Sequence, residues 1–158
     1  QGQTMTKITA ESGVAESGQA RQADTMIQHR VLPYIYRFKT HGAVGVSSQQ
    51  MNGFAIGDRK MLLNSHFFVG LQEGDLFECY HNGAWISIEY HEGVCLRVPN
   101  KDLVIFEMPK SFHQHKNNVV HFISEKDLPR VQCVEGALCK LTQDLSCMII
   151  DNLKVRPR

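Results

Sequence analysis

The chain has 158 residues, of which 42% are hydrophobic and 21% are charged, and its formal net charge is +1. These values are typical of a globular protein with one full hydrophobic core, and they argue against a bulk electrostatic grip on nucleic acid or membrane. No apolar run approaches the roughly 20 residues that a transmembrane helix needs, and we expect no signal peptide or membrane partner.

Five cysteines are an odd number, and no two of them stand in a Cys-x-x-Cys pair. This usage fits a reducing compartment better than a disulfide framework. Cys133 and Cys139 are six positions apart and have no histidine at ligand spacing. The sequence therefore predicts neither a metal site nor a cofactor.

Residues 1–23 are rich in Gln, Gly, Ser, Thr and Ala, and we expect them to form a flexible leader. From Asp24 the pattern changes, because apolar positions from Met26 to Phe38 could line one side of a helix. Pro33 interrupts this pattern, so the helix either begins late or breaks there.

Residues 24–109 are predicted to hold this short N-terminal helix and a first β-barrel. Within them, His81-Asn82-Gly83 is typical of a tight hairpin turn. Six or seven short strands without intervening helices indicate a closed antiparallel barrel, although a sandwich has the same local signals. The predicted strands include Val44–Val46, Met51–Ile56, Met61–Leu63, Leu76–Tyr80, Trp85–Tyr90, Val94–Val98 and Leu103–Phe106.

Residues 110–130 are predicted to form a connector between two barrels, and the β pattern resumes in residues 131–158. Two or three strands are too few to close a second barrel, so we expect only its beginning there. The predicted fold is thus all-β. The runs that carry this second part are Val131–Val134, Ala137–Leu141 and Ser146–Ile150.

His66 ends one β-rich segment, and Asp102 opens another apolar strand 36 positions later. Histidine suits a general base, because its ordinary pKa lies near 6.5, and a carboxylate on its other nitrogen fixes the tautomer. The sequence thus predicts a catalytic base and its orienting acid. A hydrogen-bonded structural histidine and a strand-start aspartate are the alternative interpretation.

Three segments around these residues resemble the picornavirus-type 3C cysteine proteinases, which have a chymotrypsin-like fold. Met51–Phe68 is similar to the catalytic-histidine region, Asp102–Pro109 to the acid-bearing strand, and His121–Arg130 to the inter-barrel connector. Order and spacing agree, and the similarity covers roughly residues 24–158. The resemblance implies two six-stranded barrels, with His66 as general base and Asp102 as orienting acid.

The resemblance also implies a viral polyprotein substrate, cut after Gln and before a small residue in the host cell cytoplasm. Gln1-Gly2 resembles such a junction. The family's nucleophile stands in a Gly-x-Cys-Gly turn, which this chain lacks. We therefore expect the nucleophile beyond Arg158, a complementing C-terminal chain as a candidate partner, and all five cysteines in strand-like, buried positions.

Members of the family bind viral RNA through a basic segment of the connector. The corresponding candidate residues here are Lys110, His113, His115 and Lys116, without the family's Lys-Phe-Arg-Asp signature. Two lysines give a weak electrostatic contribution, so a solvated loop is the alternative interpretation. A non-catalytic RNA- or protein-binding β-barrel remains the alternative function for the whole chain.

Overall fold

The computed structural model describes residues 5–9, 25–42, 45, 47–124, 126–127 and 134–155. These residues fall into two compact units. The first spans Tyr34–Val119, and the second combines Gly2–Pro33 with Val120–Arg158. In the part of the chain described, no helix has the length and apolar character needed to cross a membrane.

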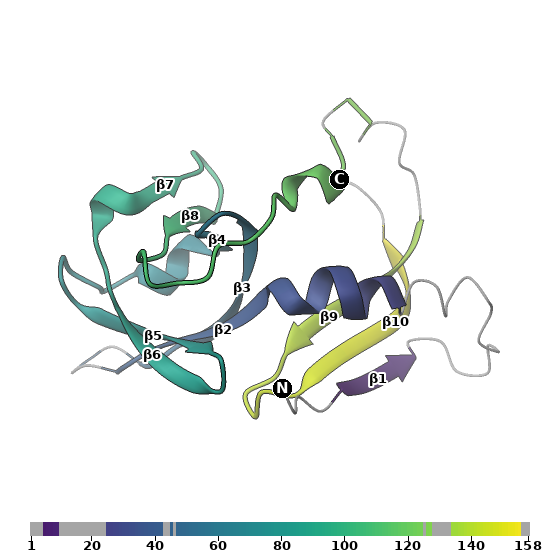
Figure 1. The fold of residues 1–158 in the computed structure, drawn as a ribbon, viewed down its shortest axis with the longest axis horizontal. Coiled ribbons are helices and arrows are strands. Elements are labelled where there is room, and N and C mark those ends of the chain that lie inside the picture. Colours follow the sequence, from purple (N-terminus) through teal and green to yellow (C-terminus); the bar gives the residue numbers. More distant parts are fainter. Residues whose placement is uncertain are drawn as a thin grey trace. The chain divides into compact units, whose positions relative to one another are not determined.

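The first unit is built on one antiparallel sheet of seven strands, in the order β6-β5-β2-β3-β4-β8-β7. Figure 1 shows this sheet curling on itself. The predicted all-β fold is therefore confirmed. The strands are β2 (Ile35–Thr40), β3 (Gln50–Gly57), β4 (Lys60–Leu63), β5 (Leu76–His81), β6 (Ala84–Glu89), β7 (Cys95–Arg97) and β8 (Val104–Glu107).

The sheet differs from the expected closed barrel, because β6 and β7 are its two edges. Among the described residues these edges are not paired with each other. The chain passes between them through a short 3-10 turn, η4 (Glu92–Val94), and β7 is only three residues long. The sheet is thus a curled half-barrel. The predicted strand Val44–Val46 lies largely outside the described residues.

The β5–β6 hairpin has the predicted tight turn. Asn82 and Gly83 both have positive φ angles, 50° and 82°, as the two central positions of a type I′ turn require. Its backbone twist matches that of the flanking strands. The register Tyr80↔Trp85 and His81↔Ala84 continues the ladder directly from the turn.

The core of this unit is rich in phenylalanine. Phe38, Phe77 and Phe106, from three different strands, are at most 1% exposed. Gly53 lies against Phe38 and Leu63, because a Cβ there would stand 2.6 Å from Phe38 Cε1 and 2.8 Å from Leu63 Cδ2. The close approach of β3 to the core thus depends on a residue without a side chain.

The predicted helix is shorter than expected, since the sequence pattern from Ile35 onward belongs to a strand. A π-helical segment, η1 (Ile27–Val31), is followed by a 3-10 turn, η2 (Leu32–Tyr34), which contains Pro33. Ile35–Thr40 then forms β2, which pairs with both β3 and β5. Two hydrogen-bonded neighbours outweigh the weak helical periodicity of this segment, so assigning it to a helix was wrong.

The second unit contains a three-stranded sheet in the order β1-β10-β9. Strands β9 (Val134–Leu141) and β10 (Cys147–Val155) are antiparallel, with a bulge between Ile150 and Leu153. The edge strand β1 (Met5–Thr9) pairs parallel with β10. Expecting an entirely flexible leader over residues 1–23 was therefore wrong for these five residues, because the sheet edge supplies backbone partners. Val131–Cys133 lies outside the described residues.

Candidate active site

Strands β4 and β8 bring His66 and Asp102 together. The two strands are antiparallel neighbours in the register Leu63↔Val104. Immediately after β4 the chain turns through a 3-10 helix, η3 (Ser65–Phe68), which carries His66. Asp102 lies two residues before β8 begins. His66 and Asp102, which are 36 positions apart in the sequence, therefore lie side by side at one end of the β4–β8 strand pair.

The histidine and the aspartate are in direct contact. Nδ1 of His66 lies 2.6 Å from Oδ2 of Asp102. The backbone N–H of His66 and the hydroxyl of Ser65 both donate to Oδ1, at 2.9 and 2.7 Å. The side-chain amide of Asn64 donates to the main-chain oxygen of Asp102 at 3.1 Å. Three consecutive residues thus hold Asp102, one through its carbonyl and two through its carboxylate.

These hydrogen bonds favour the ionised form of the aspartate. The Ser65 hydroxyl, together with the side chain and backbone N–H of His66, lowers the pKa of Asp102 to about 2. The carboxylate is therefore ionised at neutral pH. An ionised carboxylate on Nδ1 leaves Nε2 as the atom of His66 that can accept a proton. The side chains of His66 and Asp102 are 56% and 50% exposed, so the pair lies at the protein surface.

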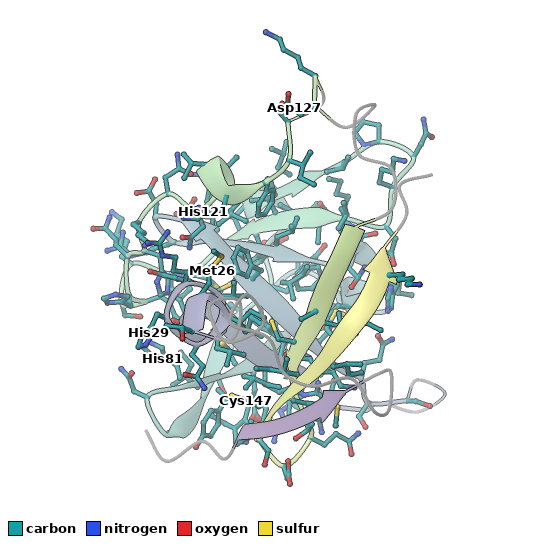
Figure 2. All side chains as sticks on the ribbon, turned by 90° about the vertical axis from the view of Figure 1, so that its right-hand side faces the viewer. Met26, His29, His81, His121, Asp127 and Cys147 are labelled. Carbon is teal, nitrogen blue, oxygen red and sulfur yellow. The ribbon has the colours of Figure 1, made fainter. Side chains whose placement is uncertain are left out.

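The described cysteines have raised thiol pKa values, so none has the properties of an activated nucleophile. Burial raises the pKa of the Cys79 thiol, and it also raises those of Cys95, Cys139 and Cys147. Cys79 and Cys147 are buried, as expected, whereas Cys95 and Cys139 are only half-buried. Figure 2 places Cys147 at the start of β10. Cys133 lies outside the described residues.

The fold of the chain, rather than the geometry of this site, can be compared with that of known proteins. No family model and no curated protein matches the chain. A solved structure of a catalytically inactive tobacco etch virus protease complexed with substrate is similar, with a TM-score of 0.52 and 14% sequence identity. The fold resembles that of a chymotrypsin-like viral protease. The match covers 78% of this chain and 53% of the protease, so the chain spans about half of that protein's length.

The candidate RNA-binding segment is anchored to the first unit at Phe112 and His115, whereas its other residues are exposed. Phe112 is only 3% exposed and lies against the ring of His81, with 4.5 Å between centroids. Tyr36 and His115 form a hydrogen bond of 2.7 Å between Oη and Nε2. His115 also bridges to Asp58 through two backbone hydrogen bonds. Phe112 and His115 therefore differ from a fully solvated loop, whereas Lys110, Ser111, His113, Gln114 and Lys116 are exposed as that interpretation expects.

The exposed candidate residues in the segment are Lys110, His113 and Lys116. The ring of His113 lies 4.8 Å from that of His115, and the Lys116 ammonium lies 5.6 Å from the Tyr34 ring centroid. Of the four candidate residues, three thus remain accessible to a ligand, while His115 is held by the sheet.

The imidazoles of His81 and His115 make stability depend on pH. Burial is the main cause that lowers the pKa of both His81 (labelled in Figure 2) and His115 below 6.5, and the neighbouring His113 lowers both values further. The unfolded chain then binds more protons below about pH 6.5, so these residues should reduce the unfolding free energy as the pH falls through that value. Urea titrations of wild type and His81→Phe at pH 7.5 and 5.5 measure the effect.

The phenyl ring of the His81→Phe variant can still stack on Phe112 but cannot bind a proton, so the variant should lose less stability on acidification than the wild type. An equal loss in both proteins would mean that His81 does not contribute. The comparison also cancels contributions from histidines elsewhere, His91 included.

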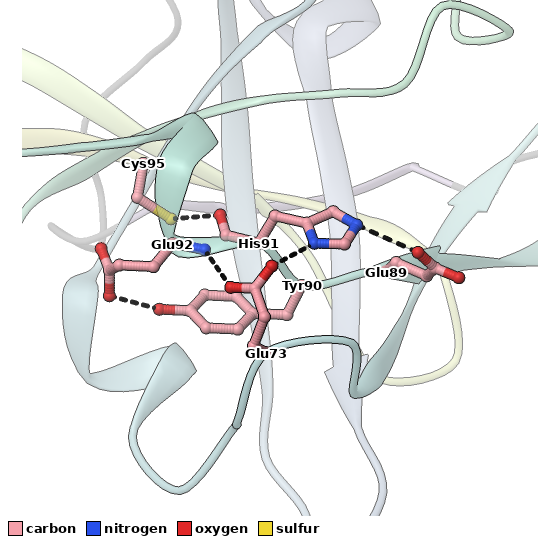
Figure 3. Close-up of polar contacts among 6 residues, drawn as sticks. All are labelled: Glu73, Glu89, Tyr90, His91, Glu92 and Cys95. Carbon is pink, nitrogen blue, oxygen red and sulfur yellow. Dashed lines mark hydrogen bonds and ion pairs between the residues drawn. The ribbon is translucent and has the colours of Figure 1, made fainter.

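A second polar cluster joins the turn before β5 to the turn after β6 (Figure 3). His91 contacts Glu73 through Nδ1 and Glu89 through Nε2. Hydrogen bonds to two carboxylates raise the pKa of His91, and that of Glu73 has the larger effect and that of Glu89 the smaller. Tyr90 and Arg97 both bond Glu92. Sequence reasoning did not single out this cluster, and among the described residues no group of three or more His, Cys, Asp or Glu side chains is placed to hold a metal ion.

Sequence reasoning also missed Ser65 and Asn64 as partners of Asp102. The available signal was their position, directly before the candidate base and opposite the start of β8. A short polar residue there is within reach of any carboxylate that contacts the histidine.

Proposed function

We propose that this chain carries the base and the acid of a viral cysteine endopeptidase that processes a polyprotein after Gln and before a small residue. The observation that carries the proposal is the 2.6 Å contact between His66 Nδ1 and Asp102 Oδ2, at the end of the β4–β8 ladder in a fold that resembles a chymotrypsin-like protease. The resemblance to 3C-type proteinases supports the substrate class, and the host cell cytoplasm is the proposed site of action.

In the proposed mechanism, Nε2 of His66 takes the proton of a cysteine thiol. The thiolate attacks the carbonyl carbon of the Gln residue, and the imidazolium then donates its proton to the leaving amine. Asp102 orients the imidazole and stabilises its positive charge. The thiol is supplied from outside residues 1–158, either by a C-terminal continuation or by a complementing chain.

Peptide cleavage tests this function. The preparation should contain residues 1–158 together with the C-terminal continuation of the same polypeptide. We expect cleavage of a Gln-Gly peptide, no cleavage of the matched Glu-Gly peptide, and loss of activity after thiol alkylation. Cleavage that persists after thiol alkylation would indicate a serine nucleophile instead of a cysteine. No cleavage of either peptide would contradict the endopeptidase proposal.

A second candidate function, RNA binding, is favoured by the exposure of Lys110, His113 and Lys116 on one short segment. Their charge is modest, so binding would be weak, and with about two phosphate contacts its dependence on salt would be shallow. A fluorescence titration of a viral-type single-stranded RNA at 50 and 200 mM salt tests it. Affinity that the Lys110→Ala/Lys116→Ala double variant leaves unchanged would contradict a role for this segment.

A further inference from the structure

The His66–Asp102 contact is exposed to water, so its geometry must be fixed by the residues around it. Half of the Asp102 side-chain surface is accessible, as is 56% of that of His66. An exposed ion pair gains little net free energy, because water competes for both partners and each side chain loses rotational freedom. Burial alone therefore does not hold this carboxylate in place.

The two carboxylate oxygens of Asp102 have different partners. Oδ1 accepts the Ser65 hydroxyl at 2.7 Å and the His66 backbone N–H at 2.9 Å. Oδ2 faces Nδ1 of His66 at 2.6 Å. The two bonds to Oδ1 fix the rotation of the carboxylate and so direct Oδ2 towards the imidazole.

The Ser65 hydroxyl has no structural task in the turn that carries it. Asn64, not Ser65, is the N-cap of η3, and the Asn64 side chain makes no capping hydrogen bond to the turn. The turn itself is closed by backbone bonds from Phe67 N to Asn64 O and from Val69 N to His66 O. The hydroxyl is thus directed at Asp102 rather than at the backbone of its own turn.

We propose that Ser65 is a positioning residue, whose hydroxyl orients the Asp102 carboxylate so that His66 keeps its proton on Nδ1 and presents Nε2 as the base. The catalytic part of this inference rests on the proposed function. The orientation of the carboxylate depends only on residues 65, 66 and 102. The low pKa of Asp102, to which the Ser65 hydroxyl contributes most, agrees with it.

The tautomer of His66 is the direct test, measured by ¹⁵N NMR on residues 1–158 at about pH 8, where an ordinary imidazole is neutral. We expect wild type to hold the proton on Nδ1, and Ser65→Ala to shift part of the population to Nε2. Ser65→Thr keeps the hydroxyl and should resemble wild type. Ser65→Val has the shape of the threonine variant without the hydroxyl and should resemble Ser65→Ala.

An unchanged tautomer in both Ser65→Ala and Ser65→Val would overturn the proposal. So would an equal shift in the threonine and valine variants, because it would trace the effect to side-chain shape. Ser87→Ala, at an exposed position on β6, is the matched control for a serine removed elsewhere.

A double-mutant cycle tests the catalytic consequence in the peptide-cleaving preparation. Ser65→Ala should lower kcat/KM about 5- to 10-fold, as for loss of a partly exposed hydrogen bond to a charged group. In an Asp102→Ala background the same change should cost less than about 2-fold. Equal losses in both backgrounds would mean that Ser65 does not act through Asp102. Absence of cleavage by wild type would refute the endopeptidase instead, and the NMR measurement would still decide the role of Ser65.

Discussion

Replacing His66 with alanine should lower kcat/KM for a Gln-Gly peptide on the order of 10⁴-fold or more. The imidazole both removes the proton of the nucleophile and returns a proton to the leaving amine, so its loss affects two steps. Its Nδ1 contacts Asp102, and its side chain is 56% exposed. Initial-rate measurements over a range of peptide concentrations give the effect on kcat and on KM separately.

His121→Ala is the control for this substitution, because His121 is also an exposed histidine in a short 3-10 turn, η5 (Val119–His121). It should cleave at the wild-type rate. If His66→Ala retained more than about a tenth of wild-type activity, His66 would be a structural histidine and the proposed base would have to be sought elsewhere.

Replacing Phe77 with alanine should reduce the free energy of unfolding by about 3–5 kcal/mol. Its side chain is fully buried, and its ring contacts those of Phe67 and Phe106 at centroid distances of 5.8 and 5.3 Å. Removing it leaves a cavity that rigid aromatic neighbours cannot fill. Since domains of this size are stable by about 5–15 kcal/mol, a large part of the stability would be lost.

Urea unfolding followed by far-ultraviolet circular dichroism measures this loss. Leu76→Ala, one position away and 49% exposed, is the matched control and should cost less than about 1 kcal/mol. A loss below about 1 kcal/mol for Phe77→Ala would contradict the packing described here. Phe67 follows His66 directly, so we also expect the cavity to loosen the turn that presents the imidazole.

Several features of the fold could be predicted because they depend on local chemistry. The Asn82-Gly83 turn needs two positive φ angles, which this pair accepts more readily than other residues. The strands around it carry period-two patterns. The contact between His66 and Asp102 could also be anticipated, since each stands at the end of a recognisable apolar run. Their catalytic roles stay predictions.

The features that were missed depend on partners distant in sequence. The segment Ile35–Thr40 becomes a strand because β3 and β5 lie on either side of it. Met5–Thr9 becomes a strand because β10 offers a free edge. Ser65 matters only because β8 brings Asp102 beside it. In each case the decisive group is supplied by tertiary structure, which composition and periodicity do not encode.

The parallel pairing of β1 with β10 has a consequence for the order in which the chain folds. Translation releases Met5–Thr9 well before its partner, Cys147–Val155, which lies about 140 residues later in the chain. The continuous stretch Tyr34–Val119 can collapse while the ribosome is still adding residues, as N-terminal parts of nascent chains do. Strand β1 has no β10 to pair with during that whole interval. The small sheet is therefore the late, high-contact-order step of biogenesis.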